Sequence, residues 1–152
     1  MENKELEYRV SKAIVFFGSG YNCSQAVFMA YSDIYAIDTT TAAKIATSFG
    51  GGMGRLREVC GAVSGMFLLL GMHYPFIDTN DKAAKDINYK AVQRTAIEFK
   101  KEMGSYICAD LLKIKHEPQV PESSVRSESY YKLRPCARCV AIAAEIVGKE
   151  IL

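Results

Sequence analysis

The sequence CGAVSG at residues 60–65, followed directly by MFLLLGM at residues 66–72, decides the fold of this chain. This segment is apolar on nearly every side, a pattern typical of a helix in the middle of a bundle. Gly61 and Gly65 are four positions apart, so they share one helix face and would let a neighbouring helix pack closely. We therefore expect a central apolar helix that is headed by a thiol.

The rest of the chain shows helical periodicity almost throughout. Residues 115–132 are the exception, because they are polar and interrupted by prolines, and we expect a loop or lid there. We find no strand alternation, internal repeat or second domain, so the sequence predicts one all-α domain over residues 1–152, a bundle of about six or seven helices. Ile34, Ile45 and Tyr89 fall on predicted apolar faces and are expected to be buried. The predicted helices lie at about residues 6–17, 23–34, 38–49, 58–72, 80–103, 105–112 and 135–151.

Composition and charge exclude several classes of function. Hydrophobic residues make up 49% of the 152 residues and charged residues 24%, which is ordinary for a soluble globular protein. The net charge of +2 is too small to indicate binding to nucleic acid or to an anionic membrane. The first residues, MENKELEYRV, are charged and lack the apolar core of a signal peptide, and the longest apolar stretch is shorter than the roughly 20 residues that span a bilayer. We therefore expect a cytoplasmic protein with no membrane insertion and no nucleic-acid partner.

Four cysteines share one sequence context, the predicted start of a helix. Cys23, Cys108 and Cys136 each lie near such a start, and Cys60 is expected in the first turn of the central helix. The positive end of the helix dipole lowers the pKa of a thiol there and favours the reactive thiolate. These four residues are the candidate catalytic residues, and we expect them to gather near one end of the bundle.

Each cysteine also has a purely structural interpretation, because a free cysteine often fills a core as a small hydrophobe. Cys139 is the strongest candidate for this, since it lies one turn into the last predicted helix. Cys136 and Cys139 have the CxxC spacing of oxidoreductases, although no strand precedes them as in a thioredoxin-like fold. Val140 follows the CxxC motif at the position where covalent haem attachment needs a histidine, so the sequence does not favour a c-type haem.

The sequence leaves the choice of cofactor open. A zinc ribbon or finger needs two close pairs of ligands, and this chain has one. Four separate helices could nevertheless bring Cys23, Cys60, Cys108 and Cys136 together around zinc or an iron–sulfur cluster. The sequence is therefore compatible with three possibilities, namely a site without a cofactor, a zinc site and an iron–sulfur cluster.

A glycine-rich loop precedes the central helix. The sequence FGGGMGR at residues 49–55 is similar to phosphate-binding loops but lacks their Lys-Ser/Thr ending, so a flexible turn is the favoured interpretation. Arg55 is close to Cys60 along the chain, so the loop should lie beside the cysteine site. We expect Arg55 and Arg57 to help hold the Cys60 sulfur ionised.

Several motifs together resemble a known family. GYNCSQAV at residues 20–27, FGGGMGR at residues 49–55 and CGAVSG at residues 60–65 are similar to the redox-active family named for its cysteine pattern, which carries a C-G-A-x-x-G motif and four characteristic cysteines. Cys108 is similar to the third of these cysteines and Cys136 to the fourth. The resemblance covers nearly the whole chain and implies thiol redox chemistry in bacterial and archaeal cells.

Two features depart from the family pattern. Residues 115–132 match nothing in it, and Cys139 stands where relatives are expected to carry an apolar residue. We therefore expect Cys139→Ser to keep most of the activity that Cys60→Ser abolishes.

These observations together predict a thiol–disulfide oxidoreductase that exchanges with a redox protein or a small thiol. Cys60 is the preferred attacking thiolate, and a neighbouring thiol would resolve the mixed disulfide. Two alternatives remain, namely a protein in which the same thiolates bind a metal or cluster, and a helical interaction module without chemistry. The residues expected to support the site are Gly51, Gly52, Arg55, Gly61, Gly65 and Cys139.

Overall fold

Helix α5 (Gly61–His73) lies in the middle of the fold in the computed structural model, which describes residues 2–152. It packs against α2 (Cys23–Tyr31), α9 (Cys136–Ile151) and α6 (Lys82–Met103). Most of its side chains are buried because neighbouring helices cover it on several sides, as its lack of a polar face requires. The fully buried side chains of α5 are those of Ala62, Val63, Met66, Leu69 and Leu70.

The remaining elements are also helical, which confirms the all-α prediction. Within residues 2–152 no strand forms, and the one β-type feature there is an isolated antiparallel bridge between Val59 and Ile107. No helix in this part of the chain combines the length and the apolar character needed to cross a membrane. The other helices are α1 (Glu2–Gly18), α3 (Thr39–Ala46), α4 (Gly50–Met53), α7 (Cys108–Leu112) and α8 (Glu128–Leu133), with 3-10 turns at Ser32–Tyr35 and Thr47–Phe49.

The helix boundaries follow the capping residues in the sequence. Asn22 and Gln25 form a reciprocal capping box at the start of α2, in which each side chain accepts from the other residue's backbone N–H. Asp38 and Asp81 cap α3 and α6 without a reciprocal bond, since each side chain accepts from one backbone N–H in the first turn of its helix. Gly104 ends α6 in the left-handed conformation, where glycine has no steric penalty.

Three residues predicted to be buried are exposed. Ile34 is 40% exposed because α2 ends at Tyr31 and continues as a 3-10 turn, which rotates the apolar face. Ile45 is 42% exposed because the short helix α3 packs on the bundle only through its alanines. Tyr89 is 57% exposed and lies edge-on against Phe76, while α6 buries a neighbouring face instead.

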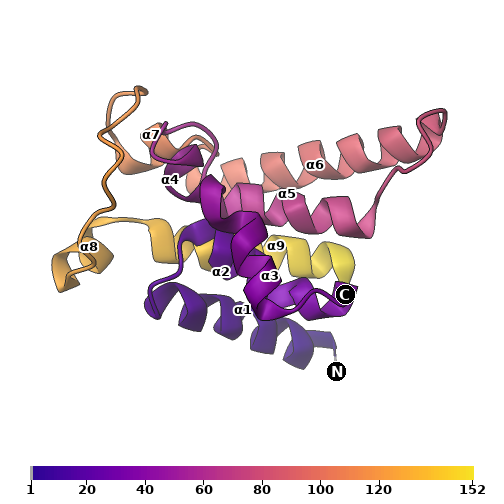
Figure 1. Cartoon of the computed structure of the whole chain (residues 1–152), viewed down its shortest axis with the longest axis horizontal. Helices are drawn as coiled ribbons and strands as arrows, with labels where there is room; N and C mark the ends of the chain where they lie inside the picture. The colour runs from indigo at the N-terminus through magenta and orange to yellow at the C-terminus, as the bar shows by residue number, and fades with distance from the viewer. Residues whose placement is uncertain (1) are drawn as a thin grey trace.

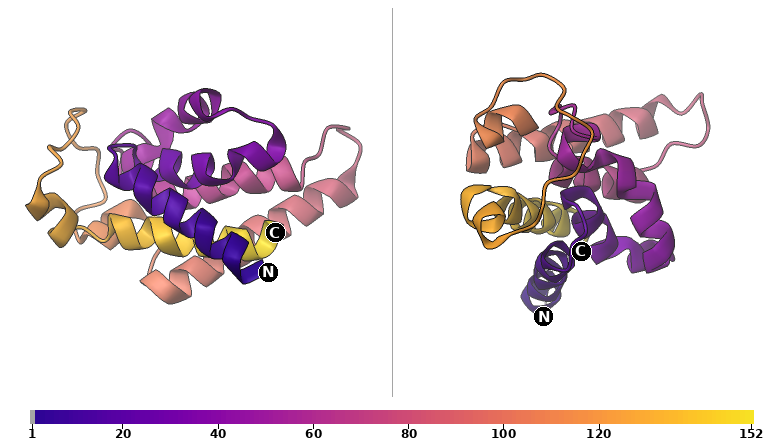
Figure 2. Two further views of the ribbon diagram at one scale, coloured as in Figure 1. Left: turned by 90° about the horizontal axis from the view of Figure 1, so that it is seen from below. Right: turned by 60° about the vertical axis from the view of Figure 1, so that its left-hand side comes forward.

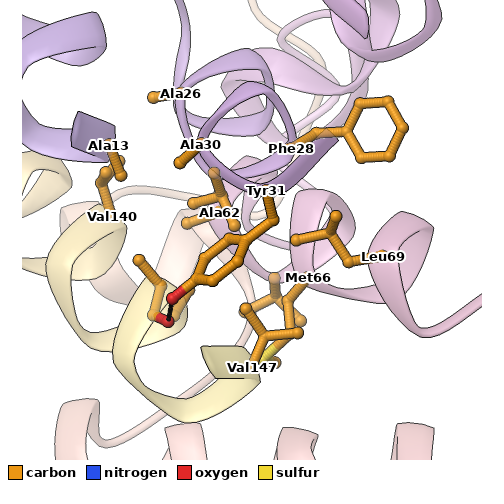
Figure 3. Close-up of a cluster of buried hydrophobic side chains, with 14 of the residues drawn as sticks. Ala13, Ala26, Phe28, Ala30, Tyr31, Ala62, Met66, Leu69, Val140 and Val147 are labelled. Atoms are coloured by element: carbon orange, nitrogen blue, oxygen red, sulfur yellow. Dashed lines mark hydrogen bonds between the residues drawn. The ribbon is translucent and has the colours of Figure 1, made fainter. Parts of the chain in front are cut away.

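The core between α1, α2, α5 and α9 joins small residues to a few large ones (Figure 3). Tyr31 reaches from α2 toward α9, where its hydroxyl donates to the carbonyl of Ala144 at 2.6 Å. Gly65 allows the close approach of α2 and α5, because a Cβ at this position would lie 2.7 Å from the carbonyl oxygen of Ser24. The small residues of the central helix therefore set the distance between the elements that carry Cys23 and Cys60.

The bundle has two different ends. Both termini lie at one end, while α8, α4 and α7 gather at the other, on the left of Figure 1. The segment between α7 and α8 passes across this second end, as the right-hand view of Figure 2 shows. Arg126 fastens that segment to the bundle by donating to the carbonyls of Phe17 and Tyr21, each at 2.7 Å. The region predicted as a loop or lid is thus held in place over one end of the helices, but its last part is not a loop, because Ser127 caps the short helix α8 there.

Candidate functional site

All five thiols of the chain line one cavity of about 60 Å³. Cys23, Cys108 and Cys136 are the first residues of α2, α7 and α9, and Cys60 directly precedes α5. Cys139 lies one turn further along α9. The structure therefore brings together the four sequence-predicted site residues and adds the fifth cysteine to them.

Backbone hydrogen bonds hold two of the helix starts side by side. The N–H of Cys60 donates to the carbonyl of Tyr106 at 2.8 Å, and the N–H of Cys108 donates to the carbonyl of Glu58 at 2.6 Å. These bonds flank the bridge between Val59 and Ile107. They fix the start of α7 against the start of α5, although the two lie far apart in the sequence.

The predicted supporting glycines let the backbone approach the sulfurs. Gly52 has a φ of +68°, and a Cβ there would lie 2.6 Å from the Cβ of Cys108. A Cβ on Gly61 would lie 3.3 Å from the Cβ of Cys23. Gly51 lines the cavity as well. A side chain at Gly52 would meet both the steric clash and the backbone strain of the left-handed region.

Cys23 and Cys136 form the outer pair of thiols, and both are half-buried. The interaction between their side chains lowers the pKa of Cys136 to about 7, with help from Arg134, Arg57 and the Tyr130 hydroxyl and against the effect of burial. The same interaction, together with burial, raises the pKa of Cys23 well above its ordinary value. Cys136 also begins a helix of 16 residues, whose dipole favours a thiolate at this position. The outer pair therefore combines one ionisable sulfur with one protonated thiol.

Cys60 and Cys139 form the inner pair, and they are only 5% and 2% exposed. Their side-chain interaction, together with burial, raises the pKa of Cys60 well above its ordinary value. The two cysteines of the CxxC motif thus face different partners, Cys136 toward Cys23 and Cys139 toward Cys60. The environment of Cys60 does not favour the attacking thiolate that the sequence suggested, because no cationic group acts strongly on it.

The fifth sulfur, that of Cys108, contacts an arginine. Nη1 of Arg57 lies 3.4 Å from the Cys108 sulfur, and Arg57 is only 2% exposed. Burial raises the pKa of Cys108, and Arg57 opposes that rise. Nε of Arg57 donates to the side-chain oxygen of Gln119 at 2.9 Å, while Nη2 is buried with no hydrogen-bond partner among the described residues.

Arg55 does not face Cys60 as the sequence predicted. Its guanidinium donates to the carbonyl of Val120 at 2.8 Å, to the hydroxyl of Ser124 at 3.1 Å and to the side chain of Gln119 at 3.3 Å. The cause lies in the backbone, because Arg55 and Arg57 have φ values of +69° and +62° and the chain reverses between them. Arg57 consequently points into the thiol cavity, and Arg55 binds the segment that crosses it.

Other residues of the site were missed by the sequence reasoning. Tyr130 and Arg134 line the cavity and act on Cys136, and Arg126 lines it as well. Ring stacking joins them, because the guanidinium of Arg134 lies 4.8 Å and that of Arg126 5.4 Å from the centre of the Tyr130 ring. The available signal was a cluster of arginine and tyrosine in the polar segment just before the CxxC motif.

The thiols do not form a preassembled group of metal ligands in the described part of the chain. Among the residues that the structure describes, no group of three or more His, Cys, Asp or Glu side chains could hold a metal ion. The thiols are instead arranged as two pairs and one arginine-bound sulfur.

Comparison with known proteins agrees with the motifs. A family model described as "Putative redox-active protein (C_GCAxxG_C_C)" matches residues 21–150. Its range includes all five cysteines and the segment across the cavity, and in this chain the stretch with the Ala-x-x-Gly spacing reads CGAVSG. No curated protein and no solved structure matches the chain.

Proposed function

This chain belongs to the redox-active family C_GCAxxG_C_C, and from that membership we propose that it is a thiol–disulfide exchange protein whose working residues are Cys136 and Cys23. The observation that carries the proposal is the outer pair itself. One sulfur of the pair has a pKa of about 7, and a protonated thiol faces it. These are the requirements for a nucleophile and a resolving residue.

The exchange has two steps. The Cys136 thiolate attacks one sulfur of a disulfide, forms a mixed disulfide and releases the other half as a thiolate. The Cys23 thiol then gives up its proton to the leaving sulfur and attacks the Cys136 sulfur, which releases the second half. The protein loses two electrons and gains a Cys23–Cys136 disulfide, while the substrate disulfide becomes two thiols. The reverse sequence would regenerate the dithiol with a reducing partner.

The surrounding residues have separate roles in this proposal. Arg134 and Arg57 stabilise the Cys136 thiolate by their charge, and Tyr130 does so by a hydrogen bond. Pro135 and Cys136 place the sulfur at the start of α9, where the free backbone N–H groups add to the positive potential. Burial of the inner pair keeps those two sulfurs from reacting first.

The test is to oxidise the fully reduced protein with hydroxyethyl disulfide, quench with acid and map the disulfides by mass spectrometry of peptides. We expect a Cys23–Cys136 linkage as the first product. Cys136→Ser should prevent it. Cys108→Ser is the matched control and should still form it, because Cys108 contacts Arg57 and not a thiol of the pair.

A first linkage between Cys136 and Cys139 would overturn this assignment in favour of the CxxC motif. Five unchanged thiols after exposure to the disulfide would support the interaction module without chemistry. Zinc or iron that copurifies with the protein in stoichiometric amount and is lost in Cys136→Ser would support the metal-binding alternative.

A further inference from the structure

A second cavity adjoins the thiol cavity and is lined by four arginines. It has a volume of about 180 Å³, and its arginines are Arg55, Arg57, Arg126 and Arg134. Its outer side includes the exposed residue Ser123. The residues that line both cavities are Asn22, Gly51, Arg57, Arg126, Tyr130 and Arg134. A molecule in the arginine-lined cavity therefore lies next to the sulfurs.

The positive charge of this cavity is not neutralised by its own walls. No Asp or Glu is found among the described residues that line either cavity. The hydrogen bonds of the four guanidinium groups go to backbone carbonyls, hydroxyls, a side-chain amide and a thiol, all of which are neutral. The pKa of Arg55 is lowered, first by burial and then by the charges of Arg57 and Arg134. An anion between these groups would relieve that repulsion.

Arg57 supplies an independent observation. Its side chain is buried on the wall shared by the two cavities, and its Nη2 has no partner among the described residues. A buried donor without an acceptor is costly, and a charged one more so. Guanidinium groups bind carboxylates and phosphates through paired N–H donors. The arrangement thus indicates an oxyanion as the missing acceptor.

We propose that the four-arginine cavity binds the carboxylate or phosphate group of a small disulfide and thereby presents its sulfurs to Cys136. This inference rests on the proposed function and names its substrate class. A small molecule fits better than a protein, because the thiol cavity is small. Its volume is about 60 Å³, and one water needs roughly 10–15 Å³ on the same measure, so only a few atoms can enter. The larger cavity then holds the anionic part of the molecule while the disulfide reaches inward.

The reaction is balanced without a further reagent. The anionic disulfide accepts two electrons and two protons in all and leaves as two thiols. The protein supplies both electrons and the Cys23 proton and becomes the Cys23–Cys136 disulfide, and solvent returns the second proton, which Cys136 lost on ionising. The arginines take no part in the bond changes. Arg134 and Arg57 stabilise the Cys136 thiolate, and the four together hold the anionic group of the disulfide.

The test compares the rates at which three disulfides of similar size oxidise the reduced protein, namely dithiodipropionate (anionic), hydroxyethyl disulfide (neutral) and cystamine (cationic). We expect dithiodipropionate to react about tenfold faster than the neutral disulfide after correction for their rates with free cysteine, and cystamine to react slowest. The preference should shrink in high salt and in Arg55→Gln, and Arg55→Lys should recover part of it. Lys100→Gln removes the same charge from an exposed site on α6 and should leave the preference unchanged.

Binding is measured separately with thiodipropionate, a thioether that cannot exchange, by isothermal titration of the wild-type protein and of Arg55→Gln. Saturable binding that weakens in Arg55→Gln supports the anion-binding cavity. It does so even if no disulfide oxidises the protein, and that failure to oxidise would refute the proposed function but not the cavity. Inorganic phosphate is then used as a competitor to distinguish a carboxylate from a phosphate group. If phosphate binds more tightly than thiodipropionate, the substrate is a disulfide that carries a phosphate group. Equal rates for the three disulfides and no saturable thiodipropionate binding would overturn the inference, even if the Cys23–Cys136 disulfide forms.

Discussion

The outer and inner thiol pairs contain the same chemical groups in opposite environments. Cys23 and Cys136 are half-buried beside arginines, while Cys60 and Cys139 are almost fully enclosed by apolar neighbours. The pKa of Cys136 falls to about 7, and the pKa of Cys60 rises well above its ordinary value. The comparison shows that position at a helix start does not suffice to activate a thiol. Cys136 has its lower pKa first through its interaction with Cys23 and then through the charges of Arg134 and Arg57, whereas burial and Cys139 raise the pKa of Cys60.

The largest expected effect is on the rate of alkylation. At pH 7 a thiol with a pKa of about 7 is about half ionised, whereas one with the ordinary pKa is only a few per cent ionised. We expect Cys136→Ser to slow the fastest reaction with iodoacetamide by at least about tenfold, because the other sulfurs are protonated or enclosed. Mass spectrometry of tryptic peptides identifies the residue that reacts first.

Cys139→Ser is the matched control on the same helix and should leave the fast reaction in place. The outcome also tests the preference for Cys60 that the sequence suggested. If Cys60 or Cys139 carries the fast reaction, the inner pair is the reactive one and the comparison between the pairs is inverted.

The next effect is on the stability of the protein, through the packing of α2 against α5. These helices carry one thiol of each pair at their starts. Gly65→Ala places a methyl group 2.7 Å from the carbonyl oxygen of Ser24, between the helices that carry Cys23 and Cys60. We expect it to lower the free energy of unfolding by about 2–3 kcal/mol, because backbone atoms on both sides resist the shift. Urea denaturation followed by circular dichroism measures this loss.

Gly71→Ala is the control in the same helix, since nothing lies within 4 Å of a Cβ there. It should raise the free energy of unfolding by about 0.5–1 kcal/mol, the usual gain from replacing glycine inside a helix. Equal losses for the two variants would mean that Gly65 does not set the distance between α2 and α5.

Local sequence patterns were sufficient to predict the central helix and most of the helix starts, but not α8, which lies in the segment that was expected to be a loop. Periodicity is a property of a few neighbouring residues, and so are the capping side chains of Asn22 and Asp38 and the terminating Gly104 that the structure shows at the helix ends. They also predicted the placement of Cys23 and Cys136 at helix starts, from which the gathering of thiols at one end was inferred.

The pairing of the thiols and the choice of arginine could not be predicted in the same way. Cys139 meets Cys60 because of how α9 packs on α5, and that depends on side chains far apart in the sequence. It is Arg57, and not Arg55, that faces the sulfur of Cys108, because the backbone reverses through residues of positive φ. An arginine in the sequence does not indicate a positive φ. The role of Tyr130 was hidden for a similar reason, since a polar segment shows no periodicity.

The pH dependence provides a smaller and more specific effect. The pKa of Cys136 is lowered, so its alkylation rate should rise as the pH increases through about 7 and level off above about 8. Arg134→Gln removes a charge that stabilises the thiolate, so the pKa should rise and the rate at pH 7 should fall by about two- to threefold, with little change at pH 9. Initial rates with iodoacetamide from pH 5.5 to 9.5 provide the profile.

Arg55→Gln is the control for charge, because it removes the same charge from a side chain that binds the loop at Val120. The midpoint of its pH profile for alkylation should lie close to that of the wild-type protein. A shift as large as that of Arg134→Gln would show that the general positive potential, and not the neighbouring charge, sets the ionisation of the outer pair.

The smallest expected effect separates a hydrogen bond from the charges around Cys136. Tyr130→Phe removes a hydroxyl whose hydrogen bond helps to lower the pKa of Cys136 but keeps the ring on which Arg134 stacks at 4.8 Å. The pKa should therefore rise slightly, and alkylation at pH 7 should slow by less than about twofold, because Cys23 and the arginines still stabilise the thiolate. Tyr130→Leu removes the ring as well and frees Arg134 to move, so it should slow alkylation at pH 7 further. If Phe and Leu at this position have the same effect, stacking does not help to hold Arg134 near the sulfur, and the hydroxyl accounts for the whole contribution of Tyr130.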